Sequence, residues 1–155
     1  METIESISVP MYQTASIAER DMRILLAGNY QDMHHHFLAP RTICEWVILL
    51  CVGGSRWVQL DKKEKISVKA GEIILLPPEV PHSYGNAENG WSLLWLHCTG
   101  ETLHALCEQI YPSEILPLPA SGIIGLFQQL LEKLRTARGF ADVLFAESLL
   151  TQILC

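Results

Sequence analysis

Short apolar runs alternate with tight turn signals along the first hundred residues of the chain. Glycine pairs, a charged DKKEK turn, two consecutive prolines and an NAENG segment separate these runs. The runs with the length and residue types of β-strands cover 23–28, 43–52, 56–60, 65–70, 72–77 and 92–98. Many short strands joined by tight turns favour an antiparallel barrel or sandwich.

The pattern changes after Gly100, where apolar residues recur at helical spacing. Residues 101–111 predict a short helix, and a second helix is predicted from residue 121 to about 138, before the natural stop at Gly139. A last helix begins near residue 140 and has two apolar stripes. They consist of Val143, Ala146, Leu150 and Ile153, and of Phe145 and Leu149. Either one stripe packs on the barrel and the other on a partner, or both are buried within the monomer.

Three segments follow from this pattern. Residues 1–20 are weakly patterned and predict an extended N-terminal arm, residues 21–100 predict the barrel, and residues 101–155 predict the helical part. The sequence stops in the middle of an apolar helix, without a cap, which predicts that the chain is a fragment of something longer.

Composition narrows the class of protein. A chain of 155 residues with 49% apolar residues is long enough for one domain with a hydrophobic core. It has no apolar run of membrane-spanning length and no secretory signal, and its five cysteines lack CxxC spacing. We therefore expect a soluble cytoplasmic domain. The net charge of −6 and the lack of a basic patch argue against DNA binding by this chain alone.

The segment GEIILLPPEVPHSYGN, residues 71–86, matches the second cupin motif, G-x5-P-x-G-x2-H-x3-N, except that Glu79 replaces a glycine. Four of its five fixed positions agree, including His82. The resemblance to cupins implies a mostly β fold. We expect a cupin-like (jelly-roll) antiparallel β-barrel followed by C-terminal α-helices.

The first cupin motif, which supplies the other metal ligands in cupin enzymes, is missing. Its spacing places Ala39 and Arg41 at the histidine positions and Trp46 at the glutamate position. A guanidinium has no free lone pair for a metal ion. We therefore predict no metal, no cofactor and no enzymatic activity. The competing hypothesis is a metal-dependent cupin isomerase or dioxygenase that uses His82 with His36 or His97.

Arg41 instead indicates a pocket for a small polar molecule. Its planar fork of donors suits hydroxyl or carboxylate oxygens, and an unpaired buried cation is costly. The alternatives are an ion pair with Glu45 or Glu79, or exposure at the rim of the barrel.

Residues 22–155 resemble the N-terminal sensing domain of AraC-type transcription regulators. The blocks that carry the resemblance are APRTICEWVILLCVGG, AGEIILLPPEVPHSYG and WSLLWLHCTG, together with the helical tail. The family implies a cupin-like barrel that binds an effector, often a sugar, and a homodimer formed through the C-terminal helix. A helix-turn-helix DNA-binding domain normally follows, and this chain lacks it.

The resemblance also implies a ligand-binding set. The sugar-contacting arginine, tyrosine and tryptophan of the arabinose-responsive member match Arg41, Tyr84 and Trp95, and a segment of the arm falls near Tyr30. Leu93 stands where that member has a histidine, which argues against arabinose but not against another sugar-like effector. His82 completes the predicted set, although we expect His82 and His97 to be interior histidines more than ligands. A stand-alone oligomerising cupin without an effector is a third hypothesis.

Overall fold

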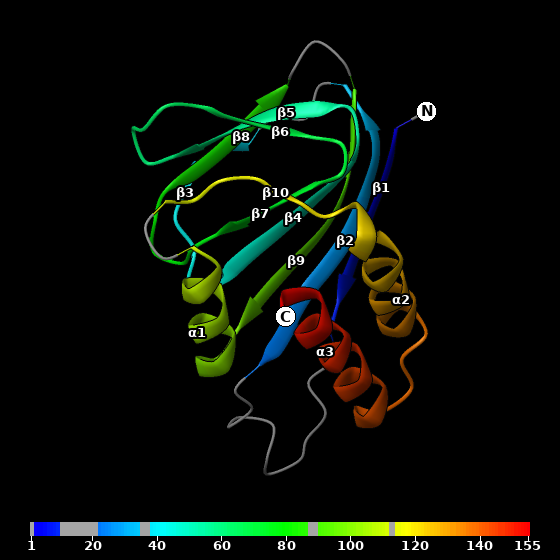
Figure 1. Cartoon of the computed structure of the whole chain (residues 1–155). Coiled ribbons are helices and arrows are strands. Elements are labelled where there is room, and N and C mark those ends of the chain that lie inside the picture. The colour runs from blue at the N-terminus through cyan, green and yellow to red at the C-terminus, as the bar shows by residue number, and fades with distance from the viewer. Residues whose placement is uncertain (1, 10–21, 35–37, 87–89, 112–113) are drawn as a thin grey trace.

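The computed structural model describes residues 2–9, 22–34, 38–86, 90–111 and 114–155. Ten strands form two antiparallel sheets that face each other as a barrel (Figure 1). The six-stranded sheet has the order β1 (Thr3–Ser8), β2 (Arg23–Met33), β9 (Trp91–Thr99), β4 (Trp46–Gly53), β7 (Glu72–Leu76), β10 (Leu118–Pro119). The four-stranded sheet has the order β3 (Leu38–Arg41), β8 (His82–Asn86), β5 (Ser55–Leu60), β6 (Ile66–Lys69).

The six-stranded sheet is covered on both faces. Side chains of β4 and β9 alternate between two apolar clusters, one inside the barrel and one between the sheet and the helices. For this reason β4 reads as the continuous apolar run WVILLC instead of an alternating pattern. On β5 the side chains do alternate, because only the face toward the barrel interior is covered.

Three helices cover the outer face of the six-stranded sheet: α1 (Glu101–Ile110), α2 (Ile124–Arg135) and α3 (Phe140–Leu154), with a short 3-10 turn η2 (Ser121–Ile123) before α2. In Figure 1 α2 and α3 lie beside β1, β2 and β9. Phe127, Leu130 and Leu150 are fully buried in the cluster between these helices and the sheet. No helix in the described ranges is long and apolar enough to cross a membrane.

The mostly β architecture with C-terminal helices is confirmed, as are the six predicted strands, with shifted ends. The strand predicted at 43–52 begins at Trp46, and β2 extends five residues past the predicted end, to Met33. The strands β3 and β8 were not predicted. The segment at 3–8, predicted as part of an arm, is a strand that pairs with β2, while residues 10–20 of that arm lie outside the described residues.

The two apolar stripes predicted on the last helix do not share one environment. Val143, Ala146 and Leu150 are buried as expected, and Leu149 from the second stripe is buried with them. Phe145 is 53% exposed, and its neighbour Leu144 is 42% exposed. The large exposed apolar side chains of α3 are therefore Leu144 and Phe145.

The cupin-motif segment has the geometry that its residue pattern implies. Gly71 has φ 86°, and its N–H donates to the carbonyl of Cys51 over 2.8 Å. Glu79, where the motif has glycine, has φ 64°, a conformation that glycine adopts at much lower cost. The departure from the motif in sequence is thus not a departure in backbone conformation.

Candidate ligand-binding site

Arg41 and His82 meet where β3 and β8 pair. They are opposite each other in the strand register, and Arg41 Nε donates a hydrogen bond to His82 Nε2 over 3.2 Å. His82 is 1% exposed, whereas Arg41 is partly buried. Arg41 is the last residue of β3. In the described chain it makes neither of the two predicted ion pairs, with Glu45 or Glu79.

The hydrogen bond fixes the protonation of His82. Nε2 accepts from Arg41 and so carries no proton, which makes the ring neutral. Burial, the positive charge of Arg41 and the neighbouring His97 together lower the pKa of His82 to about 4, with burial the largest cause. At neutral pH His82 is an uncharged acceptor that orients the arginine.

Strand β9 contributes Leu93, Trp95 and His97 to the barrel interior, because alternate side chains of a strand lie on one face. Leu93 is fully buried and Trp95 is 5% exposed. The indole of Trp95 lies 5.6 Å from the ring of Tyr30 and 5.4 Å from that of His97, centroid to centroid. In the described part of the chain Trp95 Nε1 is buried without a hydrogen-bond partner. A buried N–H donor of this kind is uncommon and points to a missing acceptor.

His97 is paired with an acidic side chain at the rim of the barrel. Its Nδ1 lies 3.6 Å from Glu45 Oε1. Burial and Arg41 lower the pKa of His97, and Glu45 opposes this shift. His97 is an interior histidine with a side-chain partner, as the sequence analysis expected.

Tyr84 and Tyr30 complete the surroundings of Arg41. Burial raises the pKa of Tyr84 to about 12, while the charge of Arg41 opposes the rise. Burial likewise raises the pKa of Tyr30, again opposed by Arg41. Both phenols therefore keep their protons at neutral pH and can donate hydrogen bonds. Four of the six predicted site residues are thus Arg41 itself and three groups on which its charge acts, His82, Tyr30 and Tyr84. Trp95 has a ring contact with Tyr30, and Leu93 lies on the same inner face of β9 as Trp95.

The sequence analysis missed Arg56, a second arginine inside the barrel. It is 1% exposed, its Cζ lies 3.6 Å above the ring of Trp91, and its Nη2 donates to the carbonyl of Met33 over 3.4 Å. Burial lowers its pKa to about 10, so it remains a cation. The signal was available: in SRWVQL the residues 56, 58 and 60 alternate toward one face, and two of them are apolar.

The described residues offer little to a metal ion. Within the ranges that the structure covers, no three His, Cys, Asp or Glu side chains converge as ligands. Trp46, at the motif's glutamate position, donates through Nε1 to His104 on the outer side. His36, a ligand in the competing enzyme hypothesis, lies outside the described residues.

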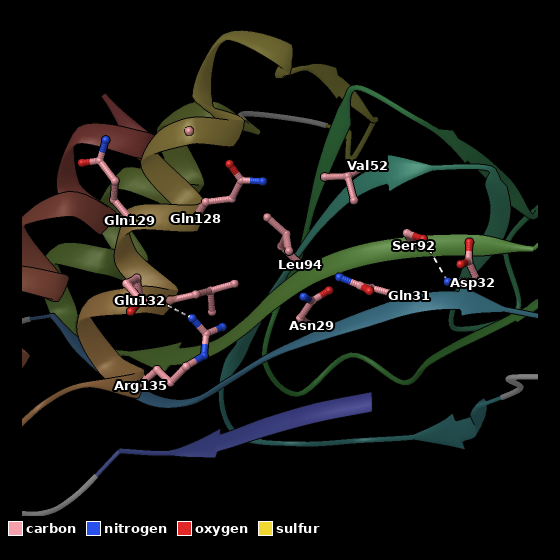
Figure 2. Close-up of a pocket in the computed structure, with 12 residues that line it drawn as sticks. Asn29, Gln31, Asp32, Val52, Ser92, Leu94, Gln128, Gln129, Glu132 and Arg135 are labelled. Carbon is pink, nitrogen blue, oxygen red and sulfur yellow. Dashed lines mark hydrogen bonds and ion pairs between the residues drawn. The ribbon is translucent and has the colours of Figure 1, made fainter. Parts of the chain in front are cut away.

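A groove of about 770 Å³ lies on the opposite face of the six-stranded sheet. Figure 2 shows Asn29 and Gln31 from β2 facing Gln128 from α2 across it. Arg135 at its end is already engaged, by Glu5 at 2.6 and 2.7 Å and by Glu132. This groove is rich in amides, and its arginine is neutralised, in contrast to Arg41 in the barrel.

The family model for the AraC-like ligand binding domain matches residues 24–154, and the chain belongs to this family. The MmsAB operon regulatory protein of Pseudomonas aeruginosa is 26% identical over 144 residues. That alignment covers 88% of this chain and 47% of the relative, so the chain spans about half the length of the curated relative that it matches.

Solved cupin structures show limited similarity. An RmlC-like cupin from Methanocaldococcus jannaschii aligns with a TM-score of 0.49 at 11% identity, covering 68% of this chain and 86% of that protein. An oxalate decarboxylase OxdC mutant from Bacillus subtilis aligns with a TM-score of 0.44 at 18% identity over 52% of this chain and 22% of its own.

Proposed function

We propose that this chain is the effector-sensing and dimerisation domain of a transcription regulator and has no enzymatic activity. Its effector is a small, polar, sugar-like molecule held inside the barrel by Arg41, Tyr84 and Trp95, with Tyr30, Leu93 and His82 around it. The observation that carries the proposal is the position of Arg41, whose charge acts on four uncharged polar side chains of the barrel.

The chemistry of these side chains suits a hydroxylated ligand. The faces of indole and phenol rings pack against the C–H faces of a sugar-like ring, while the phenol and indole hydrogens bond to its oxygens. Trp95 Nε1, which has no acceptor among the described residues, gains one when such a ligand binds. Leu93 supplies only apolar contact.

The metal-enzyme alternative is less well supported by the same geometry. His82 uses Nε2 to accept from Arg41, and His97 Nδ1 lies beside Glu45. A metal ion bound at His82 Nε2 would displace Arg41 and place two positive charges together.

Self-association is proposed to occur through Leu144 and Phe145 on α3. Both are large, exposed apolar side chains, whereas most other apolar residues of α3 are buried. An exposed apolar pair next to further helical surface is typical of an interaction site. The same helix packs against the sheet that carries Trp95.

Regulation is proposed to work as a population shift. An effector that contacts Trp95 and Tyr30 also acts on β2, to which β1 is paired. A ligand that binds one arrangement of these strands more tightly shifts the domain toward it. A DNA-binding part outside this chain would then be presented differently.

The test is ligand binding to the 155-residue chain. Thermal shift and calorimetry against pentoses, hexoses and sugar acids are expected to identify at least one stabilising compound. Arg41→Ala and Trp95→Ala are expected to lower its affinity about tenfold or more, whereas the exposed Arg138→Ala should not. If no compound stabilises the domain, or if both barrel variants bind normally, the assigned site is wrong. Stoichiometric metal that is lost in His82→Ala would support the enzyme hypothesis instead.

A further inference from the structure

The guanidinium of Arg41 uses only part of its donor capacity. Its hydrogen bond to His82 involves Nε, and in the described chain the two terminal nitrogens have no acceptor and no carboxylate within 4 Å. Arginine is nearly always ionised, and a partly buried guanidinium is costly without a counter-ion. The two terminal nitrogens together present the fork that matches a carboxylate.

The titratable groups around Arg41 do not supply the missing negative charge. His82 and His97 are neutral imidazoles, and Tyr30 and Tyr84 are neutral phenols. Among the described residues, the acidic side chain of Glu45 lies beside this group, with Oε1 3.6 Å from His97 Nδ1.

Other arginines in the structure illustrate the contrast. Arg135 contacts carboxylates of Glu5 and Glu132, although it is 40% exposed and water would solvate it well. Arg41 is less exposed, and among the described residues its hydrogen-bond partner is the neutral imidazole of His82. The His82 acceptor fixes the Nε edge of the guanidinium without neutralising it, which leaves the terminal edge in place for a ligand.

We infer that the effector is an anion, a small hydroxy acid or sugar acid whose carboxylate binds the terminal nitrogens of Arg41. This inference rests on the proposed effector-binding function and narrows its ligand class. The carboxylate supplies the counter-ion of Arg41, and the hydroxyl groups bond to the phenols and to the indole N–H of Trp95. His82 acts as a positioning residue, because it holds the guanidinium through Nε.

The experiment compares matched acidic and neutral compounds by calorimetry on the 155-residue chain. The pairs are glycerate with glycerol, gluconate with sorbitol, and galacturonate with galactose. We expect an acid to bind about tenfold or more tightly than its neutral partner, because a bidentate ion pair is lost in the latter. Its affinity should also fall between about 0.05 and about 0.5 M salt.

Two substitutions of Arg41 distinguish the effect of its positive charge from the effect of its planar fork of donors. Arg41→Gln is expected to abolish the preference for the acid, and Arg41→Lys to retain only part of it, since lysine keeps the charge and loses the fork. Glu45→Gln removes the neighbouring negative charge and should strengthen acid binding while leaving the neutral partner unchanged. Arg138→Gln is the control, and tryptophan fluorescence melts show whether each variant is folded.

The outcomes distinguish a failure of the carboxylate inference from a failure of the proposed effector-binding function. If neutral sugars bind as tightly as their acids and still depend on Arg41, the effector-binding function stands and the carboxylate inference is wrong. Acid binding that Arg41→Gln leaves intact contradicts the assigned residue. If neither class binds, both are contradicted.

Discussion

The indole of Trp95 lies directly against the backbone of Gly28, its partner in the β2–β9 register. A Cβ at position 28 would lie 2.2 Å from Trp95 Cζ2 and 2.3 Å from the carbonyl oxygen of Glu5. Position 28 therefore has no room for a side chain. Gly28 lies between Trp95 of the candidate ligand site and the backbone of the N-terminal strand β1.

Gly28→Ala is expected to destabilise the domain by about 1–3 kcal/mol, because the backbone of β1 cannot move away as a flexible side chain would. Denaturant unfolding followed by tryptophan fluorescence measures this change, and the native emission should shift as the indole is displaced. Gly125→Ala on α2 is the control. Nothing lies within 4 Å of its added Cβ, so alanine should stabilise by roughly 0.5–1 kcal/mol. Equal effects of the two substitutions would contradict the packing described.

Stability should fall as the pH decreases from about 6.5 to about 4. The folded pKa of His82 is about 4, below its ordinary value of 6.5, so within this window the unfolded chain binds a proton that the folded chain does not. A shift of this size corresponds to roughly 3 kcal/mol. In His82→Gln the amide oxygen can still accept from Arg41 but does not titrate. Its pH dependence, measured by urea unfolding, should be clearly shallower.

Some pH dependence will remain in His82→Gln, because the pKa of His97 is lowered as well. An unchanged slope in His82→Gln would mean that folding does not lower the pKa of His82.

The sequence predicted the architecture better than the ends of its elements. Apolar runs gave the strands of the large sheet, because burial on both faces leaves a strong apolar signal in β4 and β9. The strand β8 carries His82 and Tyr84 but reads as a turn, since PHSYGN contains residues typical of loops. Its strand conformation depends on pairing with β3 and β5, which lie far away in sequence.

The candidate site was predicted in part, for similar reasons. Arg41, Tyr84 and Trp95 were found through motif resemblance, but the contact between Arg41 and His82 required the register of β3 on β8. Arg56 was overlooked because a charged residue in a strand is ordinarily assigned to the solvent face. Its cation–π contact with Trp91 lies across the barrel and is not visible in the sequence.

Glu79→Gly is expected to stabilise the domain, which is unusual for a glycine substitution. Glu79 is exposed and has φ 64°, a conformation that costs a residue with a Cβ roughly 1–2 kcal/mol. The greater flexibility of the unfolded glycine chain offsets about 0.4–1 kcal/mol of this. Thermal and urea unfolding should show a net gain of about 0.5–1 kcal/mol.

Glu64→Gly is the control for Glu79→Gly, since Glu64 is also exposed and is not among the described residues with positive φ. Glu64→Gly relieves no backbone strain, so only the greater flexibility of the unfolded glycine chain acts. Stability is expected to fall by about 0.4–1 kcal/mol. A loss of stability of similar size in Glu79→Gly would show that the carboxylate of Glu79 stabilises the domain more than the backbone strain destabilises it.

Glu5 and Arg135 connect β1 to α2 through two short contacts of 2.6 and 2.7 Å. Both side chains are partly exposed, at 32% and 40%, so a double-mutant cycle with Glu5→Gln and Arg135→Gln should give a coupling of only about 0.5–1 kcal/mol. Arg135 lowers the pKa of Glu5, and the coupling should therefore be lost as the pH falls below the ordinary value of 4.5. Hydrogen exchange should accelerate in β1, and Glu132→Gln should leave that strand protected.

Phe145→Asp is expected to weaken self-association of the chain about tenfold or more, because it places a charge in the proposed apolar contact on α3. Phe145 is 53% exposed, so its replacement should change the free energy of unfolding of the monomer by less than about 0.5 kcal/mol. Sedimentation velocity over a range of concentrations measures the association. Leu116→Asp, at a 46% exposed leucine away from α3, controls for the loss of any surface hydrophobe. If both variants associate like the wild type, the dimer contact lies on another face. If both are monomeric, exposed apolar area alone drives association, and α3 has no special role.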